Sequence, residues 1–148
     1  MIREHYPVMV PGLDGSTEPD ADITAPFSGE LVSRVAQLGR AELEHALAGG
    51  EALACRSGAA PAPHERALQL RRVAQLITER SEAFAEVIAT EGGKPLADAR
   101  VEVARAAGTF ALCAEETVRF SGREIPMGGA ASSHGRMAFT TREPIGLV

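Results

Sequence analysis

Helical periodicity in the middle of this 148-residue chain most constrains its fold. Between His64 and Arg80, apolar residues recur at the i, i+3 and i+4 spacing of one helix face, while charged residues fall on the other faces. This pattern predicts an amphipathic helix with one buried stripe. The stripe comprises Ala67, Leu70, Val73, Ala74 and Ile77.

Two further helices are expected after this one. Ser81 is placed as the N-cap of a helix that ends at Gly92-Gly93, where a glycine adopts the left-handed conformation. Pro95 is placed at the first position of a longer helix that runs to about Phe120. The shorter helix is expected to bury Phe84, Val87 and Ile88, and the longer one Ala99, Val103, Ala106, Ala107, Phe110, Cys113, Ala114 and Val118.

Composition predicts a thin core and excludes several classes of partner. Hydrophobic residues make up 45% of the chain, but many are alanine, aromatic residues are 4% and tryptophan is absent. The net charge is −5 and arginines are spread along the chain, which argues against binding to nucleic acid or an anionic membrane. Only two cysteines and no secretory leader are present, so a reducing cytoplasm is expected.

The chain begins with segments that favour extended structure. Residues 1–26 are rich in proline and glycine and read as an extended arm, with short strands at Tyr6–Val10 and Asp22–Thr24. A turn at Pro26–Glu30 leads to a strand at Leu31–Ala36, which predicts a hairpin-like unit. An alanine-rich helix is then expected over Arg40–Arg56.

Gly49-Gly50 weakens the middle of that first helix, so a bent or short helix is expected there. A linker at Ser57–Pro63 separates it from the helix that follows. The chain closes in β structure, with strands expected at Glu124–Met127 and Arg136–Arg142 on either side of a loop of small residues. The final aliphatic pair, Leu147-Val148, reads as the start of a buried strand that more sequence would complete.

A series of short motifs then gives the chain a family resemblance. The last of them, Thr141-Arg142-Glu143-Pro144-Ile145-Gly146-Leu147-Val148, resembles the stretch that leads into the cofactor-binding domain of the aldehyde dehydrogenase superfamily. The earlier ones occur in that family's order, and only their combination is specific. They are Ala25 to Val32, Glu65-Arg66-Ala67, Thr90 to Leu96, Glu102-Val103 and Ala114-Glu115-Glu116.

The resemblance covers roughly residues 20 to 148 and implies both a fold and an activity. It implies the N-terminal part of an α/β family fold: an extended β arm, a helical layer of about four helices, and a strand or hairpin entering a cofactor domain. The chain divides accordingly into residues 1–26, 27–122 and 123–148. The intact family oxidises an aldehyde to a carboxylate with NAD or NADP. The lead-in from Gly135 to Gly146 looks most like the branch acting on phosphorylated, phosphono- or hydroxy-aldehydes and semialdehydes.

The same resemblance predicts that this chain lacks the family's chemistry. The nucleophilic cysteine, the general-base glutamate, the asparagine of the oxyanion site and the glycine-containing pyrophosphate turn all lie beyond Val148 in the family. We therefore expect no catalytic, cofactor-binding or metal-binding residue here, and no NAD binding by this chain alone. Its apolar helix faces and the Phe139–Arg142 strand are expected to meet the missing portion or other subunits. The alternative is a stand-alone helical module that associates with a full-length relative.

Local candidates for chemistry have simpler structural readings. Cys113 falls on the apolar helix face and is expected to be buried, whereas Cys55 beside Arg56 is expected to be exposed without a role. Glu91-Gly92-Gly93-Lys94-Pro95 follows a helix and precedes proline, so it is interpreted as a turn between helices instead of a phosphate loop.

The remaining polar candidates do not form a catalytic or metal-binding pattern. The four histidines lie in separate segments without ligand spacing; they are His5, His45, His64 and His134. Glu65 is explained by its place at a helix N-terminus. Asp98, Glu102 and Arg105 are interpreted as neighbours on a solvated helix face.

Overall fold

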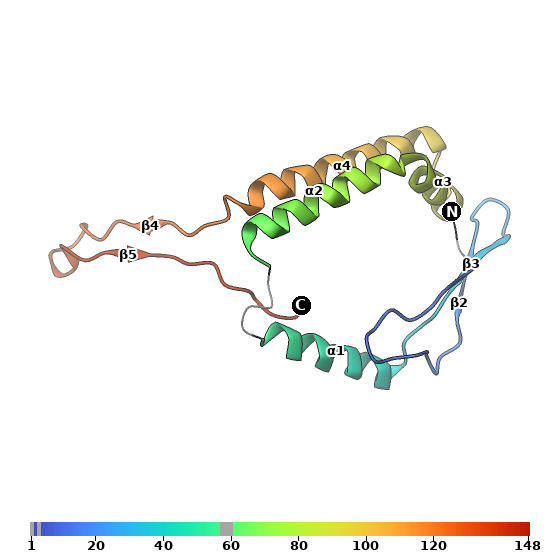
Figure 1. Ribbon diagram of the computed structural model, residues 1–148, viewed down its shortest axis with the longest axis horizontal. Helices are drawn as coiled ribbons and strands as arrows, with labels where there is room; N and C mark the ends of the chain where they lie inside the picture. The colour runs from blue at the N-terminus through green and yellow to red at the C-terminus, as the bar shows by residue number, and fades with distance from the viewer. Residues whose placement is uncertain (1, 3, 57–60) are drawn as a thin grey trace.

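The computed structural model describes residues 2, 4–56 and 61–148, which form an open ring with one projecting arm (Figure 1). Four α-helices occur in these residues, as the sequence predicts. The elements in chain order are β1 (His5–Tyr6), β2 (Ala21–Thr24), β3 (Leu31–Val35), α1 (Arg40–Ala54), α2 (Pro63–Glu79), α3 (Ser81–Gly92), α4 (Leu96–Thr117), β4 (Glu124–Ile125), the 3₁₀ turn η1 (Ala131–Ser133) and β5 (Ala138–Phe139).

The core lies where α2 and α3 pack against α4. Small side chains dominate this contact because alanine lets two helices approach closely, although each alanine buries little area. Among the described residues, the buried apolar ones are Ala67, Ala85, Ala99, Val103 and Ala114. Ile77 and Ile88 pack against the cluster from its edge. The expected thin core is confirmed.

A three-stranded sheet closes one side of the ring. β3 lies in the centre, with β1 parallel on one side and β2 antiparallel on the other. Asp22 and Arg34 are register partners in β2 and β3, and Arg34 Nε donates to Asp22 Oδ1 at 3.0 Å. Gly29, with φ 73°, makes the turn between these strands, so the predicted hairpin-like unit is confirmed. β1 is shorter than the expected Tyr6–Val10 strand and begins one residue earlier.

The loop before β2 is anchored to the first turn of α1. Thr17 donates to Glu42 Oε1 from its backbone nitrogen at 2.9 Å and from its hydroxyl at 2.7 Å. These bonds lower the pKa of Glu42, with smaller contributions from the N–H groups of Glu42 and Gly39. Glu42 Oε2 is buried against Gly39, where an added Cβ would lie 2.7 Å from that oxygen. The N-cap residue Gly39 therefore has no room for a side chain.

Helix α1 runs unbroken through Gly49-Gly50 to Ala54, so the expected shortening is wrong. Leu147 supplies a reason for one of the two glycines. A Cβ on Gly50 would lie 3.0 Å from Leu147 Cδ1, which shows that the end of the chain rests on the helix there. The glycine creates a contact surface that sequence propensity alone does not show. Of the expected linker, residues 57–60 lie outside the described part of the chain.

The boundaries of the later helices partly follow the predictions. Gly93, with φ 65°, ends α3 in the left-handed conformation, as expected. Ser81 is the first residue of α3 and makes no capping hydrogen bond, so its assignment as N-cap is wrong. Pro95 is the N-cap residue of α4, not its first helical residue, because it already has extended backbone angles. Glu65 accepts a hydrogen bond from the Ala62 nitrogen at 2.9 Å, consistent with its expected place at the start of α2.

Several residues predicted to be buried lie at the surface instead. Only one side of each helix meets another helix, so the outer part of each apolar stripe stays open. The exposed exceptions on α2, α3, α4 and just beyond are Val73, Phe84, Phe110, Cys113 and Val118. Their exposure shows that the apolar stripes are wider than the packing between these helices can cover.

Strands β4 and β5 pair antiparallel in the projecting arm, with Glu124 opposite Phe139 and Ile125 opposite Ala138. Both strands are shorter than predicted. After Phe139 the described chain has no further strand, and Ile145 is 88% exposed. The interpretation of the final residues as a buried strand is therefore wrong in this structure, because no neighbouring strand is present to pair with them.

Replacing Val103 tests the helical core. Val103 is 3% exposed, whereas Val101 on the same helix is 50% exposed. Val103→Ala removes buried carbon atoms and should lower the free energy of unfolding by about 1.5 kcal/mol. Val101→Ala should change it by no more than about 0.5 kcal/mol. Urea unfolding followed by circular dichroism measures both values, and equal effects would contradict this assignment of the core.

Acid should weaken the contact between Thr17 and Glu42. The folded-state pKa of Glu42 lies below its ordinary value of 4.5, so ionised Glu42 stabilises the fold above that pH. This contribution should fall as pH decreases through the lowered folded-state pKa. Thr17→Val should remove part of the pH dependence, while Thr24→Val, in β2, should leave it unchanged. Unfolding measured from pH 6 down to about pH 3 tests this; identical pH profiles for both variants would contradict it.

Candidate functional site

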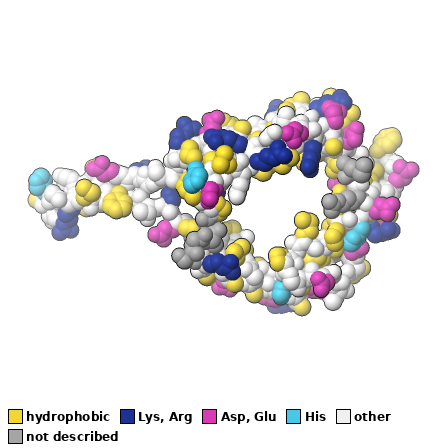
Figure 2. All heavy atoms as spheres, viewed as in Figure 1, with side chains coloured by type: hydrophobic (Ala, Val, Ile, Leu, Met, Phe, Trp, Pro, Cys, Tyr) yellow, Lys and Arg dark blue, Asp and Glu magenta, His cyan; other side chains and the backbone are white. Residues whose placement is uncertain are grey.

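Space-filling atoms show that the ring encloses a real opening, with hydrophobic side chains along the rim formed by α1 (Figure 2). On that rim lies an apolar groove of about 490 Å³. The groove is lined by Met9, Val10, Pro11, His45, Ala46, Gly49, Gly50, Ala52, Leu53 and Arg56. His45 Nε2 lies 3.4 Å from the carbonyl oxygen of Pro11, which ties one side of the groove to the other.

Helix α1 carries an exposed apolar face. Leu43 is 50% exposed, Leu47 43% and Leu53 56%. Within the described chain, α1 is not among the helices that pack closely on one another; those are α2, α3 and α4. These three leucines therefore form an apolar face that is half exposed in the described part of the chain.

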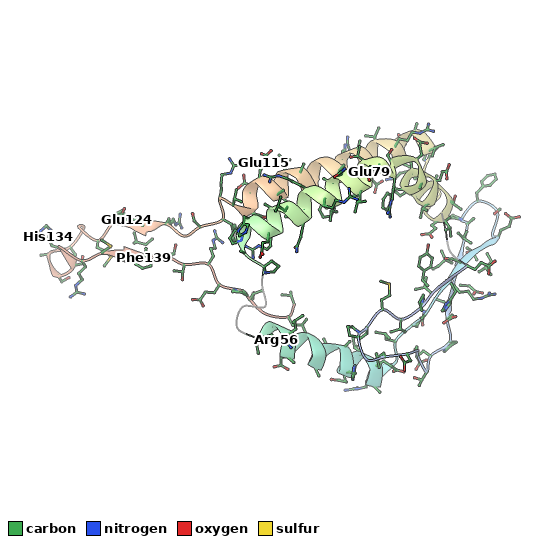
Figure 3. All side chains as sticks on the ribbon, in the orientation of Figure 1. Arg56, Glu79, Glu115, Glu124, His134 and Phe139 are labelled. Carbon is green, nitrogen blue, oxygen red and sulfur yellow. The ribbon has the colours of Figure 1, made fainter. Side chains whose placement is uncertain are left out.

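The projecting arm presents a second exposed surface. Phe139 is 68% exposed and Met137 is 84% exposed, and β4 and β5 pair only with each other among the described strands. Figure 3 shows Glu124 and Phe139 on neighbouring strands and His134 at the far tip. A two-stranded ribbon with open edges is marginal by itself and can pair with a further strand.

Neither cysteine has the setting of a nucleophile. Cys113 is exposed on α4, which overturns the expectation of a buried thiol, because this side of α4 faces away from α2 and α3. Its backbone carbonyl accepts a hydrogen bond from the Thr117 hydroxyl at 2.8 Å. Cys55 is exposed at the C-terminal end of α1, as predicted. That neither cysteine acts as a nucleophile stays a prediction.

The Gly92-Gly93-Lys94-Pro95 segment is a turn between α3 and α4, which confirms its structural interpretation. Lys94 Nζ forms an ion pair with Glu102, so this lysine is already neutralised within the chain. The segment does not follow a strand and does not fit the pyrophosphate of a dinucleotide. That no residue of this chain binds NAD or NADP stays a prediction.

The charged residues of α3 and α4 form surface pairs. Arg100 donates two hydrogen bonds of 2.9 Å to Glu82, from Nε to Oε1 and from Nη2 to Oε2. Hydrogen bonding to Arg100 lowers the pKa of Glu82 and raises that of Arg100. Both side chains are more than half exposed, so the pair orients α3 on α4 more than it stabilises the fold.

The histidines are separated in space as they are in sequence. His5 pairs with Asp20 at 3.0 Å, which connects β1 to the loop before β2. Within the described residues, no group of histidine, cysteine, aspartate and glutamate side chains has the arrangement of a metal site. The same residues include no helix that is both long and apolar enough to cross a membrane.

Close packing between Gly122 and Thr140 at the base of the arm was not predicted from sequence. An added Cβ on Gly122 would lie 1.6 Å from the Thr140 carbonyl oxygen, far closer than two non-bonded atoms can approach. The sequence predicts that the preceding helix runs to about Phe120, yet α4 ends earlier, at Thr117. The glycine is required by a contact with residues far along the chain.

Comparison with known proteins identifies the class to which this fold belongs. The model of the aldehyde dehydrogenase family matches residues 13–148. The chain is 37% identical over 131 residues to aspartate-semialdehyde dehydrogenase 1 of Pseudomonas canavaninivorans, covering 88% of this chain and 28% of that protein. It is 45% identical over 86 residues to 3-sulfolactaldehyde dehydrogenase of Priestia aryabhattai, covering 58% and 18% respectively.

Solved structures agree. Aldehyde dehydrogenase 21 of Physcomitrella patens, in complex with succinate, matches with a TM-score of 0.75 and 28% identity, over 92% of this chain and 28% of that one. The NADP complex of glyceraldehyde-3-phosphate dehydrogenase from Methanocaldococcus jannaschii matches with a TM-score of 0.67 and 32% identity, over 74% and 24%. The chain belongs to the aldehyde dehydrogenase family. It corresponds to an N-terminal part of the fold and spans about a quarter of the length of these structures.

Substitution of Gly122 should disrupt the base of the arm. Gly122→Ala forces a methyl group into the Thr140 carbonyl, whereas Gly128→Ala meets no atom within 4 Å. We expect Gly122→Ala to increase amide hydrogen exchange at Arg123 and Thr140, whose backbones are hydrogen bonded, by at least about tenfold. Gly128→Ala should leave exchange at these amides unchanged. Unaltered exchange in both variants would show that the contact does not hold the arm.

Proposed function

We propose that this chain supplies the N-terminal structural part of an NAD(P)-dependent aldehyde dehydrogenase that oxidises a small polar aldehyde to a carboxylate. The observation that carries the proposal is the family match across residues 13–148, together with a structural match over 92% of the chain. In this proposal, the chain positions other parts of the fold and contributes no group to the reaction. Alone, it is catalytically incompetent.

Its relatives support a substrate class. The similar proteins are named for 3-sulfolactaldehyde, aspartate semialdehyde and lactaldehyde, all small aldehydes that carry a polar or anionic substituent. We propose the same class for the intact protein, which agrees with the phosphorylated, phosphono-, hydroxy-aldehyde or semialdehyde branch indicated by the sequence. NADP in one similar structure and NAD dependence in another support a nicotinamide cofactor for the intact protein.

The unpartnered face of α1 supports the structural role. Three leucines along it are between 43% and 56% exposed, and the adjoining groove is apolar. Burial of apolar surface stabilises assembly by about 25 cal/mol per Å². We propose that the remainder of the family fold covers this face and fills the opening of the ring. We propose three units for the chain. They are the extended N-terminal arm at residues 1–26, the strand pair and helical layer at 27–122, and the β segment at 123–148 that leads to the cofactor domain.

Assembly between subunits is proposed for the projecting arm. The exposed Phe139 and the open edges of β4 and β5 favour addition of a strand from another chain, with the Phe139–Arg142 segment at the contact. A cytoplasmic location is proposed because both cysteines are free thiols in the structure.

A second candidate function is a helical module that binds a full-length relative and changes its assembly. The α2, α3 and α4 core favours it, since these helices pack on one another without help from α1. Such a module would fold cooperatively alone. It would bind the intact relative more tightly than a fragment of that relative.

Complementation tests the proposal. The chain is produced alone and together with the part of aspartate-semialdehyde dehydrogenase 1 that follows the matched region. We expect NAD(P)H to form from a semialdehyde only when both parts are present, and calorimetry to detect no NAD binding by the chain alone. Leu53→Asp places a charge in the groove and should prevent association, whereas Ala48→Asp, on α1 outside the groove, should not.

The outcomes separate the two candidates. Activity and copurification in the mixture, lost with Leu53→Asp and kept with Ala48→Asp, support the structural part. Binding to the full-length relative, combined with a cooperative melt and no complementation, supports the module. Saturable NAD binding by the chain alone would contradict both.

A further inference from the structure

A polar pocket of about 430 Å³ lies where the projecting arm, which carries β4 and β5, joins the helices. Its walls come from the segment after α4 and from the segment after β5, which are far apart in sequence. It is lined by Ser121, Gly122, Arg123, Thr140, Thr141 and Arg142. The lining thus contains two guanidinium groups and three hydroxyl groups, and it contains no carboxylate.

Backbone contacts hold the two walls in register. The Thr140 nitrogen donates to the Arg123 carbonyl oxygen at 2.9 Å, and the Arg123 nitrogen donates to Thr140 Oγ1 at 3.0 Å. The close approach of Gly122 to the Thr140 carbonyl adds a third contact. These contacts join the two backbone segments that carry Arg123 and Arg142, one on each side of the pocket.

Arg142 is oriented by an aromatic ring. Its guanidinium carbon lies 4.6 Å from the centroid of Phe120, a stacking distance that supports a cation–π contact. Stacking uses the face of the guanidinium and leaves its N–H groups, which point outward in the plane, able to donate. Phe120 thus holds the charge at the pocket without consuming its donors.

The two arginines of the pocket differ from a neighbouring arginine in their electrostatic environment. Arg119 pairs with Glu116 at 2.9 Å and with Glu115 at 3.9 Å. In the described part of the chain, neither Arg123 nor Arg142 makes an ion pair with a carboxylate. Glu124 and Glu143 follow these arginines in sequence, but neither of the two lines the pocket.

We propose that this pocket binds a small oxyanion, with a phosphate group as the preferred ligand. Two guanidinium groups can donate paired hydrogen bonds to anionic oxygens, and an anion between them removes the repulsion of two like charges. Ser121 and Thr141 also line the pocket, and their hydroxyl groups are further donors. The pocket shares residues 140–142 with the segment proposed above for assembly between subunits, but binding of an anion goes beyond that structural role.

Inorganic phosphate is the probe for the test. The 148-residue chain is titrated with phosphate at constant ionic strength, set with chloride, and amide chemical shifts are followed by NMR. We expect saturable shifts centred on Ser121–Arg123 and Thr140–Arg142. Arg123→Gln and Arg142→Gln should each weaken binding by about tenfold, because each removes a charged donor.

Arg136→Gln is the charge-matched control, since Arg136 is exposed on the arm and does not line the pocket. It should bind phosphate as tightly as the wild type. Thr141→Val keeps both charges and should weaken binding several-fold, which gives a milder variant if removal of either arginine unfolds the base of the arm. Circular dichroism confirms the folded state of each variant.

The results decide the proposal. Saturable shifts that are lost selectively with Arg123→Gln and Arg142→Gln support an oxyanion site. Weaker binding of acetate than of phosphate, measured in the same titration, supports the preference for phosphate. Equal displacement by acetate would still support an oxyanion site but would overturn the preference for phosphate. No shifts in the wild type would overturn the proposal. An equal loss of binding with Arg136→Gln would also overturn it, because general charge attraction would then explain the shifts.

Discussion

The contact between α2 and α4 is the interaction on which the other parts of this structure depend. It places alanines at the helix interface, with Val103 as the only larger residue among the buried apolar ones of the described chain. Small residues bring the helices together but contribute little buried area, so the cluster fixes geometry more than it supplies stability. α3 then joins the same cluster through Ala85, and its orientation is set by the Arg100–Glu82 pair.

Helix α1 lies outside the core formed by α2, α3 and α4. It is attached through Thr17 and Glu42 at one end and through the contact of Leu147 with Gly50 near the other. Neither attachment covers the leucines along its length. The opening in the ring follows from this arrangement, because a helix tethered at its ends and unpacked along one side leaves its apolar face toward the space (Figure 2). A family fold about four times longer offers the surface that would cover it.

Sequence patterns predicted the helices well because i, i+3 and i+4 periodicity and glycine stops are local signals. α2 and the end of α3 at Gly93 follow directly from them. Burial was predicted less well, since periodicity identifies an apolar face without showing whether anything packs on it. Cys113 and Phe84 lie on such faces and are exposed. The pairing of Arg142 with Phe120 and the contact of Gly122 with Thr140 join distant segments, for which a single sequence gives no signal.

The base of the arm links the two kinds of surface in this chain. The exposed Met137 and Phe139 and the open strand edges suit a protein partner, while the pocket at the base carries two arginines without a carboxylate partner among the described residues. Gly122 and Thr140 pack closely where the projecting arm meets the pocket, so a change in the angle of the arm would also move the walls of the pocket. An anion bound between Arg123 and Arg142 would therefore favour one arm orientation over others. The coupling free energy would equal the difference in the free energy of anion binding between two orientations of the arm. Assembly through the arm would in turn change the anion affinity by the same free energy.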